Sequence, residues 1–287
     1  MKYCALTFDI ENWFQVENLR SAIGKHNWND FKSTVEDNTK IILDLLREYD
    51  IRATFFILGS VAENHPGLVK AIIEEGHEIG SHGYGHDMTY DLTDDQLRRD
   101  ISRSKRILED IGGTEVVGYR APNFSVTDRV VDFLMNLGFL YDSSLNPFNL
   151  HKRYGKLARS MEFLYRGNLM RIDENFYEVP ASTLTVFSQQ VPIAGGAYFR
   201  ILPISVFKAM VARKLSIDYF YHMYLHPWEF EPQQPRVKGI SLNHKFRHYT
   251  GLANTKHKFE SFVSFLKNKN CTFLTLQEFI RRFANNT

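Results

Sequence analysis

The sequence predicts an α/β fold with a mainly parallel sheet. Short apolar runs typical of buried strands alternate along the chain with segments whose apolar residues recur at helical spacing. This strand-then-helix rhythm is characteristic of parallel α/β folds. The chain has 287 residues, which suits a single α/β barrel, a fold that typically takes about 250.

The predicted strands are apolar runs that end in polar or turn-forming residues. The first, YCALTFD, ends in an acid, and the others follow the same plan. They cover residues 3–9, 52–58, 77–83, 116–122, 140–144, 220–228 and 271–276.

The predicted helices have an apolar stripe and recognisable ends. In residues 36–49 the apolar side chains include Ile41, Ile42, Leu45 and Leu46, a helical spacing. Thr93 and Asp94 form a capping signal at the start of a later helix, and other helices begin at Pro66 or end at Gly138. The helices cover residues 36–49, 66–75, 93–111, 127–139, 257–268 and 277–284.

No linker, repeat or low-complexity tract divides the chain. We therefore expect one domain over residues 1–287. The strand–helix rhythm loosens over about 146–200, which we interpret as a loop-rich insertion, and about 229–287 forms a C-terminal extension.

Composition excludes some classes of protein. The 35 basic and 33 acidic residues give a net charge of +2 without a basic run, so no nucleic-acid partner is expected. The two cysteines, Cys4 and Cys271, are too few for a disulfide framework or a zinc ribbon and are expected to be buried free thiols.

The N-terminal sequence and hydropathy predict a cytoplasmic protein. Asp9 and Glu11 interrupt the first apolar run, so it does not resemble a signal peptide. No segment approaches the ~20 apolar residues of a membrane span.

Side chains that could bind a metal or take part in catalysis follow successive predicted strands. In βα barrels the loops at the carboxyl ends of the strands converge over the active site. The residues in these positions are Asp9, Glu11, His82, His86, Arg120, Asp142 and His226.

Two pairs of residues suggest a metal site. His82 and His86 are four apart and could bind one ion, or they could be two surface histidines in a glycine-containing loop. Asp9 and Glu11 flank Ile10, so strand alternation places both carboxylates on one side. One carboxylate could complete a His₂-carboxylate site and the other could take a proton from water, or both could be solvated loop acids.

Arg120 and His226 also have two interpretations each. Arg120 could pair with the catalytic carboxylate or form a structural salt bridge. His226 could donate a proton to a leaving amine, with Asp142 tuning it, or it could be a structural histidine.

The motifs taken in order resemble one family. TFDIEN, SHGYGH, YRAPNF, YDSS and YLHPW are similar to the motifs of the polysaccharide deacetylases, also called the NodB-homology fold or carbohydrate esterase family four. That resemblance implies an incomplete βα barrel. The stretches FDIENWF, AGGAYFR and HPWEFEPQQPR resemble more closely the branch linked to exopolysaccharide and O-antigen gene clusters.

The resemblance implies a role for each residue in metal-dependent removal of N-acetyl groups. Asp9 corresponds to the general base, His226 to the general acid, Arg120 to the residue that orients the base, and Asp142 to the acid that tunes His226. His82 and His86 correspond to the metal histidines, with Glu11 as third ligand and zinc or another divalent ion as the metal.

The resemblance also implies a substrate groove and an oxyanion site. Tyr119, Leu225 and Trp228 would line the groove that takes the acetyl group and the sugar. The backbone N–H of Tyr141 or a neighbour would stabilise the oxyanion.

The chain departs from the common pattern in the first motif. Two adjacent acids are usual there, but Ile10 stands in the second position, and Asn12 replaces a further acid of the closer branch. Two hypotheses result: an active deacetylase in cell-surface polysaccharide biosynthesis, or a silent relative that binds a saccharide or a partner enzyme. Hydrolysis of a non-sugar amide is a third. For an active cytoplasmic enzyme we expect a nucleotide- or lipid-linked N-acetylated saccharide as substrate.

Overall fold

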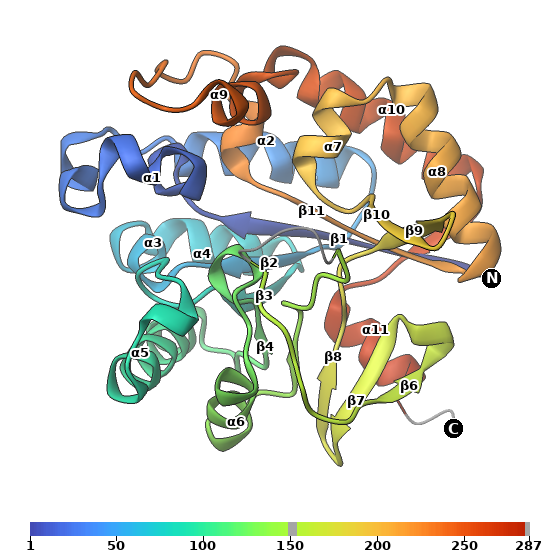
Figure 1. Ribbon diagram of the computed structural model, residues 1–287, viewed down its shortest axis with the longest axis horizontal. Coiled ribbons are helices and arrows are strands. Elements are labelled where there is room, and N and C mark those ends of the chain that lie inside the picture. The colour runs from blue at the N-terminus through green and yellow to red at the C-terminus, as the bar shows by residue number, and fades with distance from the viewer. Residues whose placement is uncertain (149–153, 285–287) are drawn as a thin grey trace.

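A computed structural model describes residues 1–148 and 154–284 (Figure 1). The strands in this part of the chain are β1 (Lys2–Ile10), β2 (Thr54–Ile57), β3 (Glu78–Ser81), β4 (Gly118–Tyr119), β5 (Tyr141–Asp142), β6 (Glu162–Leu164), β7 (Leu169–Asp173), β8 (Phe176–Glu178), β9 (Thr183–Val186), β10 (Gln189–Pro192), β11 (Phe220–Leu225) and β12 (Cys271–Phe273). The helices are α1 (Glu17–Ile23), α2 (Val35–Glu48), α3 (Gly59–Asn64), α4 (Pro66–Glu74), α5 (Asp94–Gly112), α6 (Asp128–Asn136), α7 (Gly196–Ile201), α8 (Ile204–Ile217), α9 (Leu242–Tyr249), α10 (Thr255–Asn268) and α11 (Leu276–Phe283).

The main sheet is curled and mostly parallel. Its order is β11-β1-β2-β3-β4-β5-β8-β7-β6, and β12 also pairs with β1. Every pair from β11 through β8 is parallel, whereas β7 and β6 add an antiparallel edge. The predicted α/β fold with an incomplete βα barrel is confirmed.

Strands from distant parts of the chain meet at β1. On one edge β1 pairs with β11 from Tyr3 to Phe8, and it pairs with β2 over Thr7 to Ile10 and with β12 over Lys2 to Cys4. The end of β11 therefore lies beside the end of β1, which brings residues near 226 next to residues near 9. The division into one domain with an insertion and an extension stays a prediction.

The predicted elements agree with the structure where the sequence pattern is long. Thr93 caps α5 by accepting a hydrogen bond from the Gln96 backbone N–H, and α4 begins at Pro66 as expected. The fourth and fifth strands are much shorter than predicted, at two residues each. The prediction did not anticipate α1, α3, α7, α8 or α9. In α8 the apolar residues do not form one clear stripe, which is the signal that identified the other helices.

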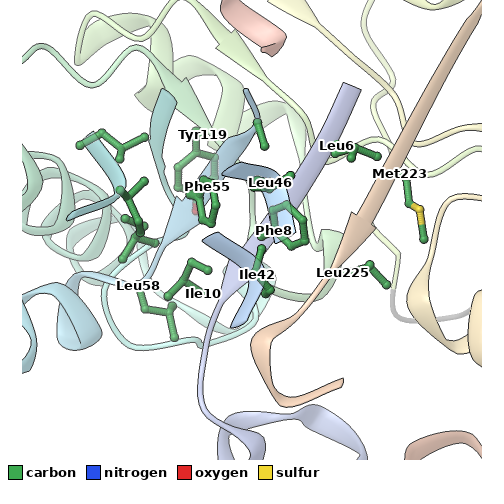
Figure 2. Packing of buried hydrophobic residues seen from close by; sticks show 14 of the residues in the cluster. Leu6, Phe8, Ile10, Ile42, Leu46, Phe55, Leu58, Tyr119, Met223 and Leu225 are labelled. Atoms are coloured by element: carbon green, nitrogen blue, oxygen red, sulfur yellow. The ribbon is translucent and has the colours of Figure 1, made fainter. Parts of the chain in front are cut away.

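The main apolar cluster lies on the outer side of the sheet, and we call it the outer core. Packing in this core sets the directions in which the side chains of β1 point. Leu6, Phe8 and Ile10 pack against Ile42 and Phe55 in the main apolar cluster (Figure 2). Because side chains alternate along a strand, Thr7 and Asp9 must then point to the opposite, inner side. Ile10 is thus a core residue, and the polar site is built from the residues on either side of it.

Both cysteines are free thiols, as expected. Cys4 is buried, whereas Cys271 is partly exposed, so the expectation of burial is right for Cys4 and wrong for Cys271. In the part of the chain that the structure describes, no helix is long and apolar enough to cross a membrane.

Candidate active site

One pocket lies where β1 and β11 end. The predicted site residues that line it are Asp9, Glu11, His82, His86, His226 and Trp228. The remaining wall includes aromatic and cationic side chains from the second half of the chain and from the loop after β4, namely Phe124, Tyr154, Arg200, Tyr224 and Arg247. Carboxylates and imidazoles therefore line one part of the pocket, and aromatic and cationic side chains line much of the rest.

Glu11, His82 and His86 form a buried cluster that could hold a metal ion. One ligand atom from each lies within 4.8 Å of the others, and all three residues are buried. The Nε2 atom of His86 is 2.6 Å from Glu11 Oε2, and the Nδ1 of His82 is 2.8 Å from the Arg120 carbonyl. That carbonyl accepts the Nδ1–H of His82 and leaves Nε2 free to face the cluster. Two imidazoles with one carboxylate fit a divalent ion such as zinc.

The loop that carries the two histidines is irregular and held from one side by α5. The carboxylate of Asp100 accepts hydrogen bonds from the backbone N–H groups of Tyr84 and Gly85, at 2.8 and 2.9 Å. Gly83 has φ +73°, and a Cβ there would lie 2.7 Å from Asp100 Oδ1, so only glycine fits. The SHGYGH stretch is therefore an irregular loop held by hydrogen bonds to Asp100, and it is not a turn of helix.

Asp9 is held by a fully buried arginine. Arg120 NH1 donates to Asp9 Oδ1 at 2.6 Å and to the Thr7 hydroxyl at 2.8 Å. Its other donors go to Ser143 and to Nε2 of His222, so all five N–H groups are used. This arrangement fixes Asp9 Oδ1 and leaves Oδ2 facing His226.

His222 completes the surroundings of Arg120 as a neutral ring. Burial lowers the pKa of His222 to about 3, and the neighbouring Arg120 charge acts in the same direction. The Nδ1–H group donates to the Pro180 carbonyl at 3.1 Å, which leaves Nε2 as an acceptor for Arg120. The sequence analysis did not include His222.

His226 faces both carboxylates of the first motif. Its Nε2 atom lies 3.8 Å from Asp9 Oδ2 and 3.7 Å from Glu11 Oε1. Its Nδ1 atom lies 3.2 Å from Glu229 Oε2, which also accepts the His226 backbone N–H at 3.0 Å. Trp228 stacks on the same ring and donates its indole N–H to Glu11 Oε1 at 3.1 Å.

Glu229 is itself held by a buried arginine. Arg200 Nε is 2.7 Å from Glu229 Oε1, and its other nitrogens donate to the carbonyls of Arg247, His248 and Thr250. A Cβ on Gly196 would lie 2.0 Å from Glu229 Oε2, so the glycine makes room for the carboxylate. The AGGAYFR and HPWEF stretches thus form one packed unit.

The charges in the pocket shift two pKa values in opposite directions. Burial by itself raises the pKa of Glu11, but the three surrounding imidazoles outweigh burial and bring it to about 2. Burial by itself lowers the pKa of His226, but Glu229 and Glu11 outweigh burial and bring it to about 9. At neutral pH these surroundings therefore keep Glu11 ionised and His226 protonated.

Several predicted residues lie away from the pocket. The prediction that Asp142 tunes His226 is wrong for this structure, because Asp142 pairs across the sheet with Glu178 and accepts the Ser144 hydroxyl. Burial raises the pKa of Asp142 to about 6. The acid that lies against Nδ1 of His226 is Glu229.

Three further residues, Tyr119, Leu225 and Tyr141, do not have the surroundings that the resemblance implied. Tyr119 and Leu225 belong to the outer apolar core (Figure 2), because alternation turns their side chains away from the inner face. The backbone N–H of Tyr141 donates to the Val117 carbonyl, so it is not free to bind an oxyanion. Asn12 does not face the cluster either, because its side-chain oxygen accepts hydrogen bonds from Ser33 and Thr34.

Comparison with protein families divides the chain near residue 142. Residues 2–141 match the model of the polysaccharide deacetylases, and residues 143–281 match a domain of unknown function, DUF3473. The similarity to the polysaccharide deacetylase family thus covers residues 2–141, which we call the deacetylase part. This deacetylase part contains the cluster of Glu11, His82 and His86 together with Asp9 and Arg120. The DUF3473 part contains His226, Trp228, Glu229 and Arg200.

The curated relatives include bacterial deacetylases that are similar to this chain over a part of its length. A peptidoglycan deacetylase of Helicobacter pylori is 33% identical over 154 residues, which cover 49% of this chain and 51% of the relative. A peptidoglycan-N-acetylglucosamine deacetylase of Bacillus cereus is 31% identical over 122 residues, covering 41% and 44%. The chain therefore spans about half the length of these relatives.

Solved structures show that the fold of the deacetylase family extends over nearly the whole chain. A family 4 carbohydrate esterase from Streptomyces lividans covers 95% of this chain and 91% of its own, with a TM-score of 0.54 and 16% identity. A family 4 pseudoenzyme from Bacillus anthracis covers 96% and 64%, with a TM-score of 0.52 and 15% identity. At such identities the likeness concerns the fold alone.

Sequence reasoning missed the residues of the DUF3473 part that support the deacetylase site. Glu229 stands three residues after His226, a spacing at which side chains meet in a helical turn, and this signal could have identified it. Arg200 and Gly196 lie in the AGGAYFR stretch, which the resemblance singled out without giving either residue a role. They lie far from residue 229 in sequence and meet it only through folding.

Proposed function

We propose that this protein removes N-acetyl groups from a saccharide by metal-assisted amide hydrolysis. The observation that carries the proposal is the common pocket in which a Glu11–His82–His86 cluster faces both an arginine-held aspartate and a carboxylate-held histidine. The similarity to bacterial peptidoglycan deacetylases supports an N-acetylated glycan as substrate. We further propose a precursor of exopolysaccharide or O-antigen, nucleotide- or lipid-linked, and a cytoplasmic location.

Glu11, His82 and His86 would hold the ion, with zinc as the expected metal. A bound ion of this type polarises the acetyl carbonyl and favours deprotonation of the attacking water. Trp228 orients Glu11 through the indole N–H. The Arg120 carbonyl orients His82 through Nδ1, and Asp100 fixes the loop between the two histidines.

Asp9 and His226 divide the proton transfers. Asp9 accepts a proton from water through Oδ2, while Arg120 keeps Oδ1 occupied. His226 delivers a proton from Nε2 to the amide nitrogen as the C–N bond breaks. Acetate and the free amine leave, and the proton taken by Asp9 replaces the one that His226 gave.

A silent relative is the second candidate, and one contact favours it. The Nε2 atom of His86 lies 2.6 Å from Glu11 Oε2, so the two side chains can form a hydrogen bond that holds the cluster together without an ion. In that case the pocket would bind a saccharide without cleaving it. The two candidates differ in metal content and in acetate release.

The test measures bound metal by mass spectrometry in protein purified without chelator. We expect about one transition ion per chain, lost in His82→Ala and Glu11→Ala. His257→Ala, at an exposed histidine outside the pocket, is the matched control and keeps the ion. Acetate release from N-acetylated chitooligosaccharides and a nucleotide-linked N-acetyl sugar then tests the reaction. Wild-type protein that takes up no metal even with added zinc supports the silent relative.

A further inference from the structure

Helix α9 exposes two large apolar side chains near the pocket. Leu242 is 83% exposed and Phe246 is 54% exposed. They are four residues apart, so they lie on the same face of the helix. Arg247, the next residue, lines the pocket. The exposed apolar face and the pocket wall therefore belong to one short helix.

Hydrogen bonds to the preceding loop hold in place the helix that carries this exposed apolar face. The Tyr249 hydroxyl donates to the Pro235 carbonyl at 3.0 Å and accepts the Val237 N–H at 2.9 Å. Deeper in, Nε2 of the buried His248 lies 2.6 Å from Gln234 Oε1. We call residues 232–249 the α9 platform. Its hydrogen bonds hold the helix and the preceding loop together, so Leu242 and Phe246 project from a fixed surface.

The α9 platform is strongly basic. From Pro232 to Phe259 the sequence has no Asp or Glu, although the protein as a whole is almost neutral. Arg236, Lys238 and Lys245 are exposed on the platform itself. Helix α9 packs against α1 and α7. Of these, α7 has no acid and α1 has only Glu17, which lies 3.6 Å from Arg20.

We propose that the α9 platform docks on the surface of an anionic phospholipid bilayer. Apolar side chains beside exposed lysines and arginines are the combination that binds such surfaces, because the rings and alkyl groups enter the headgroup boundary while the cations contact lipid phosphates. Docking in this way would hold the neighbouring pocket at the membrane, where a lipid-linked saccharide could reach it. The proposal goes beyond the deacetylase activity and can hold or fail independently of it.

An exposed ring elsewhere on the molecule provides the contrast. Phe187 is 98% exposed between β9 and β10. No charged residue lies from Ser182 through Pro192. The hairpin therefore exposes an aromatic ring without neighbouring basic residues in its sequence, and we expect it to contribute nothing to binding of anionic lipid.

The experiment is co-sedimentation of the full chain with two kinds of vesicle. One kind is phosphatidylcholine alone and the other mixes phosphatidylcholine with phosphatidylglycerol. We expect the wild type to bind the mixed vesicles, more weakly as salt rises, and not the neutral ones. The double variant Leu242→Ser/Phe246→Ser should weaken binding on the order of tenfold. Lys238→Glu and Lys245→Glu should each weaken it about fivefold or more.

Matched controls separate docking from general effects. Phe187→Ser removes a ring that is more exposed than Phe246, and Lys70→Glu reverses an exposed lysine on α4. Both should bind as the wild type does, and circular dichroism should show every variant folded. Equal loss in control and α9 variants, or no binding to mixed vesicles, overturns the proposal. Binding to dextran sulfate but not to vesicles overturns it in favour of a polyanionic glycan.

Discussion

The two halves of the pocket are positioned by different means. In the deacetylase part, Asp9 and Glu11 stand at the end of β1 and His82 at the end of β3. Both strands pair with β2, so the sheet brings these residues to one edge, where they line the pocket. In the DUF3473 part, His226 also follows a strand. Its support, however, is a buried ion pair between Glu229 and Arg200 that joins two stretches distant in sequence.

This difference predicts how substitutions in each half of the pocket should affect activity and stability. A strand end holds its side chain through the backbone, so replacing a carboxylate there removes chemistry but leaves the architecture in place. A buried ion pair is different, because loss of one partner leaves the other charge without compensation. We therefore expect substitutions in the deacetylase part to act mainly on activity, and substitutions in the DUF3473 part to act on both activity and stability.

Asp9→Asn should have the largest effect on activity. Loss of the general base should lower kcat by about 10²–10⁴-fold, because the amide cannot accept the proton from water. Metal content should stay at the wild-type level, since Asp9 is not part of the Glu11 cluster. Acetate release and metal analysis on the same preparation measure both. Full activity in this variant would remove Asp9 from the mechanism.

Glu229→Gln should lower activity about 10–100-fold. The amide no longer provides a carboxylate for the Nδ1–H of His226, and it leaves Arg200 without its ionic partner. The measurement is kcat and KM together with metal content, and we expect kcat to fall while the metal stays bound. Asp142→Asn is the paired variant. A larger loss of kcat in Asp142→Asn than in Glu229→Gln would restore the role that the sequence suggested for Asp142.

Gly196→Ala should destabilise the DUF3473 side of the pocket by about 1–3 kcal/mol. The added methyl would meet the Glu229 carboxylate, which has no room to move because Arg200 holds it. Urea denaturation measures the free energy of unfolding. Gly67→Ala on α4 is the control, because its methyl would enter open space and alanine favours helix. Equal stability of the two variants would mean that Glu229 can shift freely.

Acid should destabilise the fold gradually through His222 and His248. Burial lowers the pKa of each ring from the usual 6.5 to about 3, so both are neutral in the folded protein. Below pH 6.5 the unfolded chain binds protons that the folded chain does not. The contribution of these two rings to stability should therefore be constant above pH 6.5 and fall toward pH 3, by up to about 1.4 kcal/mol per pH unit for each ring.

Urea denaturation across this pH range checks the prediction. The variant His248→Gln, whose amide can still donate to Gln234, should show a shallower decline than the wild type. An unchanged slope would mean that His248 takes up a proton without unfolding.

Much of the fold and the first half of the site could be predicted from sequence. The apolar rhythm identified the principal strands and helices of the barrel, and alternation in β1 correctly placed Asp9 and Glu11 together on either side of Ile10. The placement of Tyr119 and Leu225 failed although the same rule applied. Family resemblance had suggested a groove position, and alternation would have placed both side chains in the core.

The sequence by itself determined the fold class, the strand ends that carry reactive groups and the two histidine ligands, whereas the choice of Glu11 as the third ligand came from the family resemblance. These features depend on local periodicity and on short spacings, which one stretch of chain contains. Only the tertiary structure decided that Glu229 rather than Asp142 contacts His226 and that Arg200 and Gly196 accommodate Glu229. It also decided that Arg120 uses all its donors on residues of β1, β11 and the segment after β5. Such contacts join residues far apart in the chain, and their geometry is set by how the curled sheet closes.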